Sequence, residues 1–362
     1  MARILVVDDD TALLDIARVL LEHQGGHEAV LSADGEEALA IAREDPPDLA
    51  IIDVMMPGMT GYEVCRQLRA SPETSSMPIL VLTARGQPVD RAAALEAGAD
   101  EHVAKPFEMS DLLDRVNELL EWGTKAARSR IVVLLGLRGG VGVTTLAVNL
   151  AATLLREGRD SVCLVDLCPS SGHVALQLGL RPEPNWSKLV SIATPDANAV
   201  EGVLMEHRSG LRVLASPIVP VVGDGLAPST VDTVLGTLQK RFEIVVVDTP
   251  SILNGTTMAA LEAATNTWLV MAAEPASVQT MLGTGRALGE QADRFSVILN
   301  QAVPGQAASP RATEQVLKRC LAGHTPFDPG QAQALARGQP LAFGEPDSPL
   351  AKAMNGLVKT LI

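Results

Sequence analysis

The stretch "VVLLGLRGGVGVTTLAVNLAATLL", Val132 to Leu155, decides the fold of the larger part of this chain. An apolar run is followed by a glycine-rich turn, two threonines and an apolar helical stretch. In such a strand–turn–helix unit, backbone N–H groups can point at phosphates, and the helix N-terminus adds its dipole. A short glycine motif alone could equally be a tight connection, but a later strand ending "VVVDTP" favours a nucleotide site.

The predicted nucleotide-binding residues of this loop are Arg138, Gly139, Gly140, Val141, Gly142, Val143, Thr144 and Thr145. Thr144 is placed to offer its hydroxyl to Mg²⁺. Val143 stands where a phosphate-binding lysine is expected. Asp166 and Asp248 end two further apolar runs, and Asp248 is the expected second-sphere magnesium carboxylate.

Outward from this loop, strand and helix patterns alternate through all 362 residues, a length that suggests two domains. The alternation predicts an α/β protein with two doubly wound parallel-sheet domains. The first is expected over residues 1–121 and the second over residues 130–362. The polar segment 122–129, which contains "GTKAARS", is predicted to be a short linker. The predicted strands are "RILVVDD", "LAIIDVM", "PILVLTA", "EHVAKP", "RIVVLLGL", "SVCLVDL", "FEIVVVDTP", "TWLVMAA" and "FSVILNQ".

The amino-acid composition argues against several classes of function. Residues 1–121 carry 24 acidic and 9 basic residues, whereas the remainder is near neutral, so no nucleic-acid partner is expected. The four cysteines form no CxxC pair, which argues against a zinc or disulfide framework and indicates reduced thiols. No run approaches the ~18 apolar residues of a membrane span, and the acidic start is not a signal peptide. A cytoplasmic location is expected.

In the first domain, the predicted strands end at residues suited to phosphoryl transfer. Asp8, Asp9 and Asp10 follow the first strand, and Asp53, Thr83 and Lys105 follow later ones. In doubly wound sheets such groups gather at the carboxyl ends of the strands. Converging carboxylates repel one another and need a hard divalent cation such as Mg²⁺, after which one Asp can act as a nucleophile. Taken singly, each residue could be a helix cap or a surface base.

Together with "DVMMPGMTGYEV" and "KPF", these residues carry a resemblance: residues 1–121 resemble a CheY-like response regulator receiver domain along their whole length. The resemblance implies that Asp53 is the phosphoacceptor. It also implies that Asp8, Asp9, Asp53 and the Met55 backbone carbonyl hold Mg²⁺. A sensor histidine kinase or phosphotransfer protein is then the expected partner.

The same resemblance makes Thr83 the switch hydroxyl and Lys105 the phosphate-pairing lysine. Pro106 is expected to follow a cis peptide bond. One departure concerns the switch aromatic, which is His102 in "ADEHVAKPF". This could alter how phosphorylation is relayed but leaves the acceptor chemistry in place.

Residues 130–362 resemble the ParA/MinD family of deviant-Walker ATPases, whose loop reads KGGxGKT. The first lysine of that loop is Arg138 here and the second is Val143. The family's water-positioning acid falls on Cys168, which leaves Asp166 in place. Three departures therefore coincide on groups that bind phosphate or promote hydrolysis.

Each departure has a physical consequence. Val143 removes a point charge from the phosphates, while the backbone amides remain. Arg138 keeps a cation that, by resemblance, could reach a dimer partner's nucleotide. The Cys168 thiol orients water poorly because it is mostly protonated at neutral pH. Binding of ATP or ADP with Mg²⁺ is expected, with hydrolysis slow or absent, and Asn300 in "VILNQAVPG" is expected to contact adenine by resemblance.

The combined architecture, with "VDL…GHVALQLGL", resembles CpaE/TadZ-type pilus-assembly proteins. It implies a phosphorylation-controlled localisation factor, a homodimer whose partners are pilus-assembly or polar components, at the cell pole or peripheral to the inner membrane. The alternative is an active ParA/MinD-like ATPase in partition or positioning. A third hypothesis, a receiver-controlled DNA-binding protein, rests on fold analogy alone.

The last segment has apolar residues at helical spacing: Leu350, Met354, Leu357, Val358 and Leu361. A membrane-surface helix would need a strongly basic polar face. With two lysines and no aromatic residue, packing against the core is favoured over peripheral membrane contact.

Overall fold

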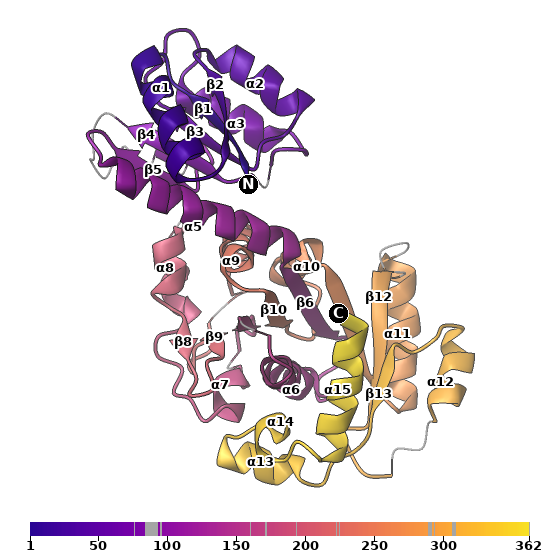
Figure 1. Cartoon of the computed structure of the whole chain (residues 1–362). Coiled ribbons are helices and arrows are strands. Elements are labelled where there is room, and N and C mark those ends of the chain that lie inside the picture. Colours follow the sequence, from indigo (N-terminus) through magenta and orange to yellow (C-terminus); the bar gives the residue numbers. More distant parts are fainter. Residues whose placement is uncertain are drawn as a thin grey trace. The chain divides into compact units, whose positions relative to one another are not determined.

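The computed structural model describes residues 1–75, 77–83, 93–94, 96–159, 161–170, 172–192, 194–221, 223, 225–288, 292, 294–305 and 309–361, with the backbone alone at 121–128 and 287–288. The chain divides into two compact units, Met1–Arg128 and Ser129–Ile362. Each unit is an α/β structure around its own sheet (Figure 1). The predicted fold class, two doubly wound domains, is confirmed.

The first unit contains a five-stranded parallel sheet in the order β2-β1-β3-β4-β5. Its strands are β1 Arg3–Val7, β2 Glu28–Ser32, β3 Leu49–Asp53, β4 Ile79–Thr83 and β5 Glu101–Ala104. Its described helices are α1 Thr11–Val19 with the π-helical turn η1 Leu20–Gln24, α2 Gly35–Glu44, α3 Gly61–Ala70 and α5 Met109–Arg128. β3 and β4 are buried along their whole length, as apolar runs in a covered parallel sheet should be.

Local sequence fixes where the helices of this unit begin. Asp10 accepts a hydrogen bond from the Ala12 N–H at 2.9 Å and caps α1. Thr60 and Glu63 form a reciprocal capping box at the start of α3. These caps set the positions of the loops that follow β1 and β3.

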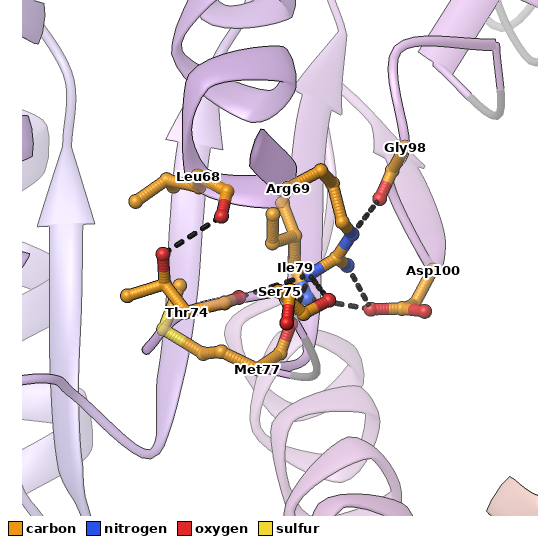
Figure 2. Close-up of polar contacts among 8 residues, drawn as sticks. All are labelled: Leu68, Arg69, Thr74, Ser75, Met77, Ile79, Gly98 and Asp100. Atoms are coloured by element: carbon orange, nitrogen blue, oxygen red, sulfur yellow. Dashed lines mark hydrogen bonds and ion pairs between the residues drawn. The ribbon is translucent and has the colours of Figure 1, made fainter. Parts of the chain in front are cut away.

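A cationic side chain joins several segments of the first unit (Figure 2). Arg69, in the last turn of α3, donates hydrogen bonds to the carbonyls of Thr74, Ser75, Met77 and Gly98 at 2.6–3.4 Å. It also contacts the Asp100 carboxylate at 2.7 Å. This carboxylate accepts the Ile79 N–H at 2.9 Å, so one arginine ties the end of α3 to the starts of β4 and β5.

The second unit contains an eight-stranded sheet in the order β13-β12-β11-β6-β10-β7-β9-β8, in which only the edge pair β8–β9 is antiparallel. The strands are β6 Arg130–Gly136, β7 Val162–Asp166, β8 Met205–Glu206, β9 Arg212–Leu214, β10 Ile244–Asp248, β11 Asn266–Ala272, β12 Phe295–Asn300 and β13 Gly323–Thr325. The helices are α6 Val143–Arg156, α7 Val174–Gln177, the 3₁₀ turn η2 Trp186–Leu189, α8 Ala197–Glu201, α9 Pro228–Arg241, α10 Gly255–Ala263, α11 Pro275–Leu288, α12 Pro310–Leu317, α13 Gln331–Arg337, α14 Leu341–Gly344 and α15 Pro349–Leu361.

The core of the second unit has two apolar layers, one on each face of the sheet. Successive residues of β6 alternate between them: Val132 and Leu134 join the layer that contains α6, whereas Ile131 and Val133 join the layer that contains α9. A strand buried on both faces should read as a continuous apolar run, which is what "RIVVLLG" is.

The C-terminal helix α15 belongs to this core. Its apolar residues, Leu350, Met354, Leu357, Val358 and Leu361, are all buried in the layer around α6. Core packing, the favoured prediction for this helix, is confirmed. Among the described residues, no helix combines the length and the apolar character needed to cross a membrane.

The segment 122–129, predicted as a linker, is helical up to Arg128 as the end of α5. Ala, Lys and Arg are strong helix formers, and they outweigh the single Gly123. The polar composition did not reveal this helical conformation, and the assignment of 122–129 as a linker stays a prediction.

Candidate functional site

In the first unit, buried polar side chains meet at the carboxyl edge of the sheet. Asp8 follows β1, Asp53 ends β3 and Thr83 ends β4, and these three residues are 5% exposed or less. Lys105 directly follows β5. Because all the strands are parallel, these ends come together at one edge, as the sequence predicted.

Lys105 lies between the two buried carboxylates. Its Nζ is 2.7 Å from Asp8 Oδ2 and 2.7 Å from Asp53 Oδ1. Partial burial by itself lowers the pKa of Lys105, but the hydrogen bonds and charges of Asp53 and Asp8 outweigh it and hold the pKa above its usual value. The lysine is therefore a fixed positive charge beside the Asp53 carboxylate.

The loop after β3 orients the Asp53 carboxylate. Its Oδ2 accepts a hydrogen bond from the Met55 N–H at 2.7 Å. Gly61, which begins α3, lies against the strand end: a Cβ there would be 2.1 Å from the Asp53 carbonyl oxygen. Only glycine permits this approach.

The predicted magnesium ligands lie around Asp53. Asp8 is buried and, like Asp53, contacts Lys105; Asp9, the next residue, is exposed; and the Met55 N–H donates to Asp53. Carboxylate and carbonyl oxygens are the donors that Mg²⁺ prefers, so the residues present fit this ion. Lys105 holds Asp8 and Asp53 together by hydrogen bonds of its own.

The structure also describes the surroundings of Pro106, Thr83 and His102. The Lys105–Pro106 peptide bond is cis, as expected. The Lys105 N–H donates to the Thr83 carbonyl at 2.7 Å, which links the ends of β4 and β5. His102, in the switch position, has its Nδ1 3.4 Å from the Glu101 carboxylate.

In the second unit, the glycine-rich loop connects β6 to α6. Gly140 and Gly142 have φ angles of 81° and 97°, a left-handed conformation that favours glycine. α6 begins at Val143 immediately after Gly142, so the loop leads into a helix N-terminus. Gly139 and Gly140 are exposed, and Thr144 and Thr145 are half-buried. This is the backbone geometry required of a phosphate-binding loop.

Val143 points into the protein. It is 7% exposed and belongs to the apolar layer around α6 together with Val141. Gly136 makes room for both: a Cβ at this position would be 2.5 Å from Val143 Cγ2 and 2.7 Å from Val141 Cγ2. The residue that replaces the expected lysine is thus a core residue.

Two polar contacts link the glycine-rich loop to other segments of the second unit. The Asn300 side-chain amide donates to the Val141 carbonyl at 2.7 Å, and its oxygen accepts from the Thr325 hydroxyl at 2.6 Å. Gly142 leaves the space that this amide occupies, since a Cβ there would be 2.2 Å from Asn300 Nδ2. Arg138 makes an ion pair with Glu274, which follows β11.

Beyond the loop, Asp248 and Asp166 end the neighbouring strands β10 and β7 and face each other in register. Asp248 is fully buried, and neither of its carboxylate oxygens has a hydrogen-bond partner among the described residues. Burial raises its pKa well above the ordinary value, the charge of Asp166 raises it further, and the nearby Thr144 hydroxyl lowers it in part.

Asp166 is also buried, and burial raises its pKa to about 6 despite hydrogen bonds from the Cys168 and Val174 N–H groups. Cys168 lies against both carboxylates. Burial, followed by the charges of Asp166 and Asp248, raises the pKa of its thiol far above the usual range. In the absence of a cation the thiol therefore stays protonated at neutral pH and cannot replace a carboxylate that orients water.

Comparison with known proteins assigns both units. Residues 4–117 match the family model of the response regulator receiver domain. Residues 129–288 match the family model of an AAA domain. The chain joins a response regulator receiver domain to an AAA domain.

The receiver domain has close curated relatives. The response regulator MprA of Mycolicibacterium vanbaalenii is 48% identical over 118 residues, which are 33% of this chain and 50% of that protein. The chain thus spans about half the length of the curated relatives it matches.

The AAA domain has the fold of MinD and ParA proteins. The septum site-determining protein MinD from Pyrococcus horikoshii, complexed with Mg-ADP, is 21% identical with a TM-score of 0.55, covering 64% of this chain and 96% of that one. A ParA family ATPase from Chlorobium tepidum is 20% identical with a TM-score of 0.57, covering 65% of this chain and 99% of that one. At such identities the likeness shows the fold alone.

Sequence reasoning missed two residues of the AAA domain's loop site. Glu274, the ion-pair partner of Arg138, lies 136 residues away along the chain. Thr325 belongs to a three-residue edge strand. For Asn300, both ends of the amide are engaged in holding the loop, a role that the sequence did not suggest. Its contact with adenine stays a prediction.

Proposed function

We propose that this protein is a phosphorylation-controlled assembly or localisation factor. The receiver domain is the input, with Asp53 as phosphoacceptor and a histidine kinase or phosphotransfer protein as donor. The AAA domain is the output, which binds ATP or ADP and dimerises with little hydrolysis. The observation that carries the proposal is the burial of Val143 in the core, at the position where a lysine would bind phosphate.

The input chemistry follows from the contacts of Asp53. Its carboxylate is held by the Met55 N–H at one oxygen and by Lys105 at the other. An Asp53 carboxylate oxygen attacks the phosphorus of the donor's phosphohistidine and forms an acyl phosphate. The P–N bond of the donor breaks, its imidazole leaves and takes up a proton from solvent, and Lys105 balances the charge added at Asp53. Mg²⁺, when bound by Asp8, Asp9 and the Met55 carbonyl, would supply charge neutralisation at the phosphoryl oxygens.

Thr83 and Lys105 are proposed to relay phosphorylation. The Thr83 hydroxyl is buried at the end of β4, one strand from Asp53, and the Lys105 N–H bonds to the Thr83 carbonyl. A shift in the position of Thr83 or Lys105 is therefore expected to move the end of β5. His102 lies on β5 and is placed to report that change on the surface.

The output chemistry relies on backbone rather than on a lysine. The amides between Gly139 and Thr144, together with the α6 N-terminus, are proposed to bind the phosphates, and Thr144 is proposed to meet Mg²⁺. Cys168 lacks a charge with which to orient water, since its thiol is held protonated. Phosphoryl transfer depends on positioning and on charge, and both are reduced here.

Dimerisation is proposed to use Arg138. Its side chain is 46% exposed on the loop, and Glu274 holds the guanidinium within its own chain. Release from Glu274 would free a bidentate cation for the nucleotide of a partner subunit.

The biological setting proposed is assembly of a Tad or type IVb pilus, where the protein would recruit pilus-assembly or polar components at the cell pole or the inner membrane. Support comes from the order of the two domains and from the resemblance of the sequence to CpaE/TadZ-type proteins. Deleting the gene in a bacterium that carries it should abolish surface pili, and an Asp53→Asn allele should alter their number. Normal piliation in the deletion strain would refute this setting.

The decisive experiment measures ATP binding by calorimetry with Mg²⁺ and phosphate release in parallel. Binding without turnover supports the proposal, and Thr144→Ala should then weaken binding. Turnover at rates typical of an ATPase would favour the second candidate, an active ParA/MinD-like ATPase in partition or positioning. Asp53 phosphorylation is measured separately with acetyl phosphate as donor and Asp53→Asn as control.

A further inference from the structure

Three side chains at the carboxyl edge of the second sheet have the arrangement of a metal site. The Cys168 sulfur and one carboxylate oxygen each from Asp166 and Asp248 lie within 4.8 Å of one another. Asp166 and Asp248 face each other across the β7–β10 ladder, and Cys168 follows two residues after Asp166. Two adjacent strands therefore fix the relative positions of the three groups.

Asp248 supplies an independent sign of a missing ligand. The residue is 0% exposed, and both carboxylate oxygens lack a hydrogen-bond partner among the described residues. A buried carboxylate without partners is costly unless it is paired or coordinates a metal. Its polar neighbours are the Thr144 hydroxyl and Asp166, a second carboxylate, so the repulsion between the two acids is relieved either by a bound proton or by a cation between them.

The surroundings of Asp166 are built to hold its carboxylate still. The Cys168 and Val174 N–H groups donate to its two oxygens at 3.0 and 3.3 Å. Gly172 packs so closely that a Cβ there would be 2.0 Å from Asp166 Oδ2. The Trp186 indole N–H donates to the Asp166 backbone carbonyl at 2.8 Å. Such supporting contacts orient the ligands of metal sites.

We propose that Asp166, Cys168 and Asp248 bind a divalent transition-metal ion of the Zn²⁺ class. One sulfur and two carboxylate oxygens suit Zn²⁺, whereas Mg²⁺ takes oxygen ligands. Zn–S and Zn–O distances of about 2.3 Å and about 2.1 Å imply ligand separations of about 3.5 Å, so ligand atoms that lie within 4.8 Å of one another need to approach by at most about 1.3 Å. Metal binding displaces the thiol proton to solvent, and three protein ligands leave one coordination position open.

This site shares Asp248 with the second sphere expected for the magnesium that the proposed function assigns to Thr144 and a nucleotide, but its ligands are different. That ion is expected to be held by oxygens and to arrive with the nucleotide. The ion proposed here is bound by the protein alone and depends on Cys168. The two ideas can fail separately, because metal titration needs no nucleotide and nucleotide binding can be measured after chelation.

The test is titration of the full-length, chelator-treated protein with Co²⁺ in the absence of nucleotide. A thiolate–Co²⁺ charge-transfer band with intense tetrahedral ligand-field bands is expected at one equivalent, and Zn²⁺ should displace both. Cys168→Ser should remove the thiolate band, and Asp248→Asn should weaken binding by roughly tenfold or more. The matched control is Cys320→Ser, which removes an exposed thiol and should leave the band unchanged.

A fourth variant keeps the test independent of folding defects. Cys168→Asp makes the site all-oxygen, so the ratio of Zn²⁺ to Mg²⁺ affinity should fall by about a hundredfold or more. Circular dichroism of the metal-free variants establishes that they are folded. The proposal is overturned if the wild-type protein gives no thiolate band, if the band survives in Cys168→Ser, or if a folded Cys168→Asp keeps the wild-type metal preference.

Discussion

Arg69 of the receiver domain permits a stability prediction that can be worked out from its contacts (Figure 2). Its side chain is 22% exposed and makes an ion pair with Asp100, whose side chain is 6% exposed. The same guanidinium bonds to backbone carbonyls, of which Met77 at 2.6 Å and Gly98 at 2.8 Å are the closest. Arg69→Ala removes all of these contacts at once.

The magnitude follows from what is left behind. Breaking a buried ion pair by removing one partner costs about 3–5 kcal/mol. Asp100 keeps its hydrogen bond from the Ile79 N–H, which places the cost near the lower end of that range. We therefore expect a loss of about 3 kcal/mol, which is roughly a 150-fold rise in the opening constant of the receiver. Arg69→Lys keeps the charge but loses the planar fork, so an intermediate loss is expected.

Hydrogen exchange followed by mass spectrometry measures this loss, because peptides of β1, β3 and β4 report on the receiver separately from the AAA domain. The matched control is Arg18→Ala. Arg18 is also in the last turn of a helix and pairs with Asp15, but both side chains are about half exposed or more. Its removal should cost ~0.5 kcal/mol. If Arg69→Ala and Arg18→Ala accelerate exchange equally, the reasoning from burial is wrong.

Three further predictions concern the AAA domain. The double variant Val143→Lys with Cys168→Asp restores two charges and should raise phosphate release by at least about tenfold; a colorimetric phosphate assay that finds no rise would contradict the assigned roles. Glu274→Gln frees Arg138 and should strengthen nucleotide-dependent dimerisation in analytical ultracentrifugation, whereas Arg138→Ala should weaken it. Burial lowers the pKa of His207 below its usual 6.5, so its contribution to stability is present above that pH and is lost as the pH falls through the lowered value. Thermal unfolding should show this acid-side loss in the wild type and a smaller loss in His207→Phe.

The long elements of the fold were predictable because each carries its own signal. The β6 run and the α6 helix flank a glycine turn, and both sheets consist mostly of buried apolar runs. The short strands β8, β9 and β13 have two or three residues each, too few for any periodicity. They pair because longer neighbours provide an edge, and that is tertiary information.

The receiver site was predictable for a similar reason. Its residues directly follow buried parallel strands, so strand order alone brings Asp8, Asp53 and Lys105 together. The residues that hold the glycine-rich loop of the AAA domain in place were less predictable. Glu274, which follows β11, and Asn300, at the end of β12, reach the loop from segments distant in sequence, and neither belongs to a short motif. The cluster at Cys168 was hidden too, because a single cysteine between strand-end carboxylates has no CxxC spacing.

The contacts that hold the glycine-rich loop of the AAA domain bear on how the two domains could be coupled. In this chain the loop keeps its shape through the packing of Val143 and Val141 and through the Asn300 amide, all of which are internal contacts. Because these contacts already hold the loop, we expect nucleotide binding to change the conformation of the loop little. The groups that a nucleotide or a partner can still move are Arg138, through its ion pair with Glu274, and the buried Asp248. These contacts therefore fit the proposal that the receiver controls assembly of subunits better than they fit control of a cycle of hydrolysis.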